Sequence, residues 1–280
     1  MQLTPKRHHY LLSRMMQSQA PLRTILTVLL RKLGIGTFET RMALGSLERP
    51  HYAFLVYNAA KLGKKLGHQR ISVIEYGVAG GQGLLVLEKY AAEVSKLLSI
   101  DIDLYGFDAG SGLPPPKDYR DLPYHWNQGM FHMDESKLRG KLQRAVLVLG
   151  NIEETSTEFF QKYNPAPIGA VIYDFDFYSS TRTALEMLHA GHRYYLPRVF
   201  CYFDDTIGTE VELFNDYTGE RLAINEFNQE NRDIKLAQPY CLLSSTVPIW
   251  HQQIWVSHFL KHTEYNVFVS HVENQLSISG

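Results

Sequence analysis

The chain has little cysteine, no long apolar run and almost no net charge. Two cysteines among 280 residues cannot build a disulfide framework, which fits a cytoplasmic setting. The apolar runs are far shorter than the roughly 18–20 residues of a membrane span, and no apolar segment follows the basic residues near the start. We therefore expect neither a transmembrane segment nor a signal peptide. The basic residues do not interleave with a known nucleic-acid-binding module, so no nucleic-acid partner is expected.

A net charge of −1 hides an uneven distribution. Residues 1–70 hold twelve Lys or Arg against two Asp or Glu, and the rest of the chain holds 16 against 27. A basic segment attracts anionic surfaces or substrates, but the same composition also describes a solvated helical surface. Helical periodicity over residues 7–34, broken at Pro21, and over 52–66 predicts a helical cap in residues 1–70. We expect this cap to close the ligand side of the core or to form a homodimer interface.

From residue 71 onward, short apolar runs rich in β-branched residues alternate with helical stretches. This alternation predicts a mostly parallel sheet with helices on both faces, a Rossmann-like α/β core over residues 71–280. Two late strands separated by a short turn predict an antiparallel C-terminal edge. The expected helices cover 83–97 and 180–190, and the expected strands cover 71–76, 103–107, 145–149, 170–173, 199–203, 253–257 and 266–270.

A glycine-rich loop follows the first core strand, where residues 75–83 read EYGVAGGQG. Gly77, Gly80 and Gly81 let backbone approach a ligand at the carboxyl end of the sheet. Ala79 breaks the dinucleotide fingerprint G-x-G-x-x-G, and no G-K-[ST] follows for a phosphate loop. The acidic Glu75, two positions before the first glycine, is typical of methyltransferases and can face the cationic methionine end of S-adenosylmethionine. A purely structural glycine turn is the alternative.

Two further residues are candidates for the same ligand. Asp108 ends the second strand, 25 residues after Gly83, and its carboxylate can accept hydrogen bonds from both ribose hydroxyls. Its alternative role is that of a turn residue before Gly110. Asn151 follows the strand at 145–149, and we assign it to the edge of the adenine.

Four carboxylates follow two other strands. Asp174 and Asp176 come after the strand at 170–173, and Asp204 and Asp205 come after the strand at 199–203. Both pairs are expected on the ligand side of the sheet, where they would repel one another unless protonated or neutralised by a cation. A hard divalent ion is the simple solution, and Mg²⁺ is the usual choice. Alternatively, Asp176 or Ser179 caps the helix that begins near residue 180.

Taken together, these motifs resemble the macrocin O-methyltransferase family, metal-dependent class I methyltransferases that act on sugar hydroxyls of natural products. EYGVAGG at 75–81 is similar to the family's E-x-G-V-x-x-G-G, and FDAGSGLP at 107–114 to its D-S-F-E-G-L-P. DFDFYSST at 174–181 is similar to D-G-D-L-Y-x-S-T. FDD at 203–205 and AINEFN at 223–228 resemble D-D-Y and A-V-D-E-F-R. Phe175, Thr206 and Asn228 depart from the family pattern.

The resemblance implies that Asp174, Asp204 and Asp205 hold the metal, that Asp176 is the general base and that Asp108 binds the cofactor ribose. The implied substrate is a hydroxyl of a sugar or of a glycosylated natural product. Two other functions stay open at this point. A protein that keeps the fold for binding or scaffolding but has lost catalysis is favoured by Phe175. A nicotinamide-dependent oxidoreductase is disfavoured by the glycine spacing.

Overall fold

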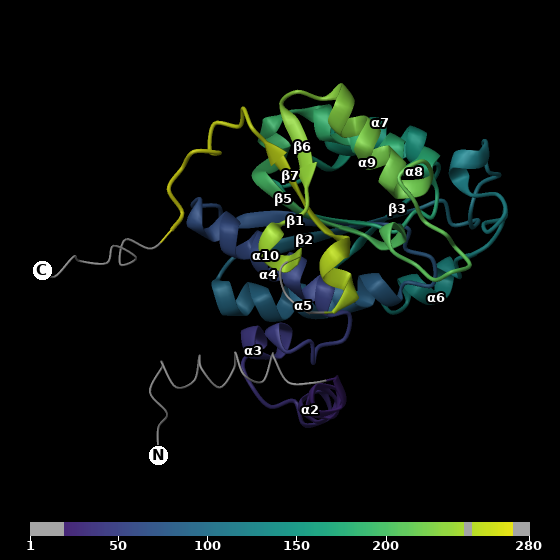
Figure 1. The fold of residues 1–280 in the computed structure, drawn as a ribbon. Coiled ribbons are helices and arrows are strands. Elements are labelled where there is room, and N and C mark those ends of the chain that lie inside the picture. Colours follow the sequence, from purple (N-terminus) through teal and green to yellow (C-terminus); the bar gives the residue numbers. More distant parts are fainter. Residues whose placement is uncertain (1–19, 244–247, 271–280) are drawn as a thin grey trace, which may run out of the picture.

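The computed structural model describes residues 20–243 and 248–270. They form one seven-stranded sheet with the order β3-β2-β1-β4-β5-β7-β6, in which β1 to β5 are parallel and β7 runs antiparallel to β5 and β6. This is the expected mostly parallel, Rossmann-like sheet with an antiparallel edge (Figure 1). The strands are β1 Arg70–Tyr76, β2 Asp101–Asp108, β3 Val146–Leu149, β4 Ile168–Tyr173, β5 Tyr195–Phe203, β6 Ile234–Ala237 and β7 Ile254–Phe259.

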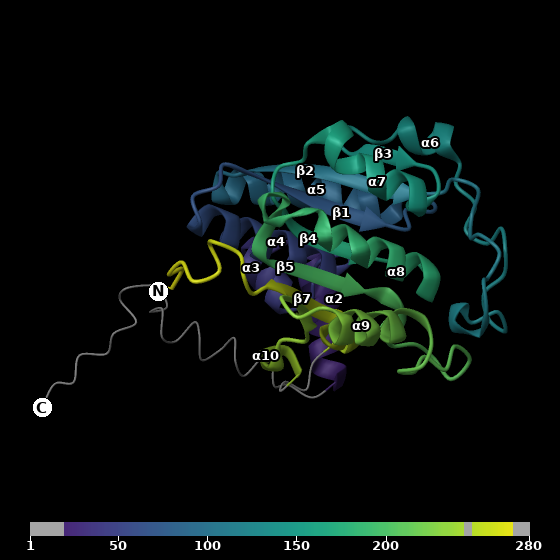
Figure 2. The same cartoon turned by 90° about the horizontal axis from the view of Figure 1, so that it is seen from above.

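Helices cover both faces of the sheet (Figures 1 and 2). One layer contains α4 and α5, with α3 packed outside them, and the other contains α7, α8 and α9. The helices are α2 Ala20–Leu33, α3 Phe38–Ala43, α4 Pro50–Lys65, α5 Gln82–Leu98, α6 Glu135–Arg139, α7 Ile152–Tyr163, α8 Tyr178–Glu186, α9 Gly219–Glu230 and α10 Tyr240–Leu243. Short 3-10 turns are η1 Tyr119–Asp121, η2 Met187–Ala190, η3 His192–Tyr194, η4 Asp204–Thr206 and η5 Ile249–Gln253.

The central strands read as nearly continuous apolar runs because both of their faces are covered. Every residue of β4, IGAVIY, is buried, and β1 is buried from its second residue to its last. β1 nevertheless includes two buried polar residues, Ser72 and Glu75. A buried carboxylate costs free energy unless it is paired or protonated, so Glu75 points to a role other than packing.

One of the two strands of the antiparallel edge differs from the expected pair. β7 confirms the strand expected at 253–257, but residues 266–270 form no strand. β6 takes their place and pairs with β7 along Ile234–Ala237. Because β5 and β6 occupy both edges of β7, no edge of that strand is left for residues 266–270 to pair with. The helix expected over 180–190 is also divided, since α8 ends at Glu186 and a 3-10 turn follows.

Helix α4 belongs to the layered core. Its buried face packs on β4 and β5, and Gly169 of β4 permits the close approach. A Cβ at Gly169 would lie 2.9 Å from the Cβ of Ala59. This packing brings the first residues of α4 to the carboxyl ends of β1 and β5, near Glu75 and Tyr202. The division of the chain at residue 70 stays a prediction.

Helix α2 presents apolar side chains to solvent. Ile25, Leu29 and Leu33 of the expected apolar stripe are exposed, and Pro21 lies in the first turn, where its missing N–H is tolerated. The other helix expected in this region falls on residues 1–19, outside the described residues. Among the described helices, none combines the length and apolar character needed to cross a bilayer. The homodimer interface and the cytoplasmic setting stay predictions.

Candidate functional site

The glycine loop connects β1 to α5 and lies between the ends of β2 and β4. Gly77 donates its N–H to the carbonyl of Phe107 at 2.9 Å and adopts a positive φ of 79°. A Cβ on Gly77 would lie 1.7 Å from the carbonyl oxygen of Asp174, so no other residue fits there. Around Gly80, by contrast, an added Cβ would meet no atom within 4 Å. Gly81 also has a φ of 79°, and a Cβ there would lie 2.1 Å from Cδ1 of Leu138. Packing therefore fixes Gly77 and Gly81, whereas Gly80 leaves open space.

Glu75 lies beneath this loop with one carboxylate oxygen in use. Tyr52 of α4 donates its hydroxyl to Oε1 of Glu75 at 2.7 Å, and the side chain is only 2% exposed. Oε2 has no hydrogen-bond partner among the described residues. Burial, which disfavours the charged form, raises the pKa of Glu75 to about 7. Gly83 is needed above it, because a Cβ there would lie 1.9 Å from Oε1.

Asp108 links the end of β2 to the glycine loop through a hydrogen bond. Its Oδ2 accepts from the N–H of Ala79 at 2.8 Å, and its Oδ1 accepts from the N–H of Gly110 at 2.6 Å. The hydrogen bond to Gly110 is the turn role considered as an alternative, and the hydrogen bond to Ala79 joins the two elements expected to share a ligand. Each oxygen keeps a lone pair for a further donor.

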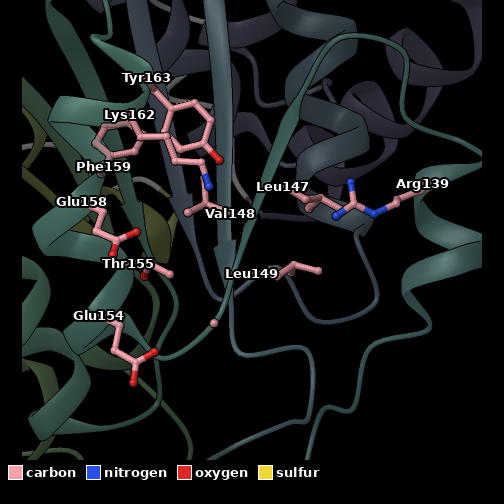
Figure 3. Close-up of a pocket in the computed structure, with 11 residues that line it drawn as sticks. Arg139, Leu147, Val148, Leu149, Glu154, Thr155, Glu158, Phe159, Lys162 and Tyr163 are labelled. Atoms are coloured by element: carbon pink, nitrogen blue, oxygen red, sulfur yellow. The ribbon is translucent and has the colours of Figure 1, made fainter.

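Asn151 has a structural role that was not identified from the sequence. It is the N-cap of α7, and its side chain accepts from the N–H of Glu153 at 3.1 Å. It directly follows Gly150, which lines a pocket of about 460 Å³ at the outer edge of the sheet, between β3, α6 and α7. Figure 3 shows Arg139 on one side of this pocket, and Glu154 and Lys162 on the other. The contact of Asn151 with adenine stays a prediction.

The four aspartates come together at the ends of β4 and β5. Oδ2 of Asp205 accepts from the N–H of Asp176 at 3.0 Å, and Oδ1 of Asp204 accepts from the hydroxyl of Tyr202 at 2.5 Å. Asp176 is 8% exposed and has a φ of 63°, the left-handed region that is costly for a residue with a Cβ. The hydrogen bond that the N–H of Asp176 donates to Asp205 stabilises this conformation.

Asp176 does not cap α8. The N-cap position is Phe177, which offers no side-chain hydrogen bond. Instead, the buried Asp121 reaches across from η1 and accepts from the N–H of Ser179 at 2.8 Å and from its hydroxyl at 2.9 Å. The capping alternative for Asp176 and Ser179 is therefore wrong. The carboxylate of Asp176 is free for another role.

A fifth carboxylate completes the cluster and was not identified from the sequence. Glu220, in the first turn of α9, is fully buried, and its Oε2 accepts from the N–H of Asp205 at 3.0 Å. Its Oε1 has no hydrogen-bond partner among the described residues. An acidic residue in the first turn of a helix is common on surfaces, so its position in the sequence gave no sign of burial.

Burial and the neighbouring carboxylates raise the pKa values of Asp174, Asp176 and Asp205. Burial and the neighbouring Asp204 raise the pKa of Asp176 to about 7. Burial also raises the pKa of Asp174 well above its ordinary value, with contributions from Asp204 and Asp176. For Asp205, burial and the nearby Glu220 act in the same direction. The cluster therefore holds more carboxyl groups than can ionise together without a cation.

In the described part of the chain, no group of three or more His, Cys, Asp or Glu side chains is arranged to hold a metal ion. The expected ligands Asp174, Asp204 and Asp205 are of the right chemical type for a hard cation. However, an oxygen of Asp205 is bound to the backbone of Asp176, and an oxygen of Asp204 is bound to Tyr202. The structure brings the three residues to one region without assembling a metal site.

Arg49 is the cation beside these carboxylates, and it too was not identified from the sequence. It is the N-cap of α4 and has left-handed backbone angles, φ 44° and ψ 65°, directly before Pro50. Burial works to lower the pKa of its guanidinium, but Tyr52 and the carboxylates of Glu75 and Asp174 outweigh burial and raise the pKa. No local pattern predicts that the residue before a helix-starting proline lies near Glu75, 26 positions further along the chain.

Two loops meet beyond the carboxyl ends of the strands. Tyr124 donates its hydroxyl to the carbonyl of Glu212 at 2.5 Å, which joins the segment after β2 to the segment after η4. Trp126 is buried against Leu122 and Phe177 and anchors the aromatic segment at 124–132. These contacts hold the segment against the body of the protein at Trp126 and against the neighbouring loop at Tyr124.

Comparisons with known proteins identify the fold. A scan against protein-family models and a search of curated proteins give no match. Among solved structures, CalS11, a calicheamicin methyltransferase, matches with a TM-score of 0.53 and 18% identity over 87% of this chain and 95% of that chain. The O-methyltransferase NovP matches with a TM-score of 0.49 and 12% identity over 75% and 79% of the two chains. The likeness to CalS11 establishes a shared Rossmann-like fold; the NovP match is too weak to add to it.

Proposed function

We propose that this chain is an S-adenosylmethionine-dependent O-methyltransferase that acts on a hydroxyl of a sugar or of a glycosylated natural product. The observation that carries the proposal is the arrangement at the carboxyl edge of the sheet. Asp108 is tied to the glycine loop on one side, and the carboxylate cluster lies at the ends of β4 and β5 on the other. The fold shared with a calicheamicin methyltransferase supports it. The sequence motifs that resemble the macrocin O-methyltransferase family agree with this proposal.

In this proposal the cofactor lies over the ends of β1 and β2. Gly77, Gly80 and Gly81 form its loop, and the open space at Gly80 admits the ligand. The free lone pairs of Asp108 accept from the ribose hydroxyls, and Asn151 meets the adenine. Glu75 faces the cationic methionine end. The sulfonium methyl group would then point toward the carboxylate cluster, where an acceptor hydroxyl can approach in line with the S–CH₃ bond.

Binding of S-adenosylhomocysteine tests the cofactor site. We expect wild-type protein to bind it and Asp108→Ala to bind it at least tenfold more weakly, because charge-assisted hydrogen bonds are worth about 1.5–3 kcal/mol. Isothermal titration calorimetry measures both affinities. Asp103→Ala is the matched control, since it removes a carboxylate from the opposite end of the same strand. If NAD binds and S-adenosylhomocysteine does not, the chain is not a methyltransferase.

The acceptor hydroxyl must lose a proton as its oxygen attacks the methyl group. Asp176 is the proposed acceptor of that proton, since its carboxylate is free of capping and its raised pKa of about 7 suits a general base. Burial of the site excludes water, which strengthens the interactions that align the oxygen. Mg²⁺, held by Asp174, Asp204 and Asp205, would lower the pKa of the acceptor hydroxyl when bound.

The metal proposal has a test of its own. We expect Mg²⁺ to bind wild-type protein, and Asp204→Asn to abolish that binding while S-adenosylhomocysteine affinity stays within about threefold. Calorimetric titration with MgCl₂ measures the loss. Asp216→Asn is the control, because Asp216 lies on an exposed segment and pairs with Arg221. Absence of Mg²⁺ binding by the wild type, together with turnover that is unaffected by a chelator, would leave a metal-free methyltransferase.

The alternative of an inactive scaffold gains nothing from the structure. Phe175, the departure that favoured it, stacks on Tyr76 with ring centroids 5.0 Å apart and packs against the core. The bulky side chain therefore packs against the core, and Asp174 and Asp176 both remain in the carboxylate cluster. No observation in the described residues favours loss of catalysis.

A further inference from the structure

Arg49 is a cation held in a costly conformation with most of its hydrogen-bonding capacity unused. Its backbone is left-handed although it precedes Pro50, a position that favours extended angles. Its guanidinium lies 5.2 Å from the ring centre of Tyr52 and donates to the Tyr52 hydroxyl at 3.3 Å. Among the described residues it makes no ion pair. Five N–H donors thus have a single protein acceptor.

The Tyr52 hydroxyl separates this cation from an anion. Arg49 donates to the hydroxyl, and the hydroxyl donates to Oε1 of Glu75. Glu75 lies directly under the glycine loop, with Gly83 in contact with its carboxylate. A positive group and a negative group on either side of one hydroxyl are complementary to an α-amino acid, which carries a carboxylate and an ammonium on the same carbon atom.

The surroundings explain why a ligand's carboxylate needs a cation here. Asp174 and Asp204 contribute to the raised pKa of Arg49, and Glu75 lies on the far side of Tyr52. An anionic group entering this region alone would be repelled by those carboxylates. A guanidinium offers two parallel N–H groups that match a carboxylate, so Arg49 can both neutralise the ligand and orient it.

We propose that Arg49 binds the α-carboxylate of the methionine moiety of the cofactor. The inference rests on the proposed function, because it takes S-adenosylmethionine as the ligand. It assigns a cofactor-binding role to the start of α4, a segment outside the glycine loop and Asp108. The competing interpretation is that Arg49 only neutralises the carboxylates of the protein. In that case, removing Arg49 would change the affinities of all ligands of the adenosine site by the same factor.

Three ligands and two substitutions separate these interpretations. The ligands are S-adenosylhomocysteine, its decarboxylated analogue, which keeps the amine, and 5′-methylthioadenosine, which lacks the amino acid. We expect Arg49→Ala to weaken the binding of S-adenosylhomocysteine by about tenfold to a hundredfold. The affinities for the other two ligands should change by less than about twofold. Arg49→Lys, which keeps the charge but loses the paired donors, should lie between. Calorimetry with melting curves of each variant measures the affinities and confirms folding.

The wild-type protein supplies a check that needs no variant. There, the decarboxylated analogue should bind about tenfold to a hundredfold more weakly than S-adenosylhomocysteine, the same factor as the substitution. Equal losses for all three ligands in Arg49→Ala, or no wild-type preference for the carboxylate, would overturn this inference alone. If wild-type protein binds neither S-adenosylhomocysteine nor 5′-methylthioadenosine, the proposed function fails, and this inference fails with it.

Discussion

Asp176→Asn is expected to slow methyl transfer by about 10²–10⁴-fold, the usual contribution of a general base. The substitution keeps the shape of the side chain but removes the group that accepts the proton. The hydrogen bond from the N–H of Asp176 to Asp205 involves the backbone, so the loop conformation should survive. Transfer of labelled methyl from S-adenosylmethionine to a panel of deoxysugar glycosides measures the rate, and S-adenosylhomocysteine affinity should stay within about twofold.

The pH dependence provides a second readout for Asp176. Because burial and Asp204 raise its pKa to about 7, the wild-type rate should rise as the pH passes through about 7 and the carboxyl group ionises. The Asp176→Asn variant should lose that rise. Asp216→Asn, on an exposed segment, is the control and should keep both the rate and the profile. Full activity of Asp176→Asn would place the base elsewhere.

Glu75→Gln is expected to stabilise the unliganded protein at pH 8 by about 2–3 kcal/mol and to leave it nearly unchanged at pH 4.5. Burial raises the pKa of Glu75 from its ordinary value of 4.5 to about 7 in the folded protein. Between these two values the folded state binds the proton more tightly than the unfolded state, so the wild-type free energy of unfolding falls as the pH rises. A glutamine stays neutral at both pH values and can still accept from Tyr52.

Urea unfolding at pH 4.5 and pH 8, without cofactor or metal, measures this difference. Glu135→Gln is the control, because Glu135 lies on the surface of α6 and pairs with Arg139. The aspartates with raised pKa values act in the same direction, so part of the slope should remain in Glu75→Gln. A pH slope identical to that of the wild type would show that Glu75 ionises in the folded protein as easily as in the unfolded one.

The sequence was sufficient for the features that depend on local patterns. β1 to β5 and α5 were located because buried parallel strands are short apolar runs and the helix between them has regular periodicity. The glycine loop, Asp108 and the two aspartate pairs follow directly from these strand ends. Parallel strands place their carboxyl ends at one edge of the sheet, so their proximity could be predicted without knowing the strand order.

The features that the sequence did not reveal depend on long-range packing. β6 has four residues, and only its pairing with β7 makes it a strand. Arg49 and Tyr52 reach the site because α4 packs across β4 and β5, and no motif in 49–52 indicates that. Glu220 is buried because of where α9 lies on the sheet. The capping of α8 by Asp121, 58 positions from Ser179, is equally nonlocal.

The contact between Gly77 and Asp174 determines which parts of the molecule can open. Gly77 touches the carbonyl of Asp174 and donates to Phe107, and the N–H of Asp174 donates to Tyr76. The glycine loop and the ends of β2 and β4 are thereby locked into one rigid unit. We therefore expect any opening for small molecules to occur in the surrounding segments, such as the two joined by Tyr124 and Glu212, and not at the sheet edge. If a conformational step limits the proposed methyl transfer, we expect it to be a movement of these loops.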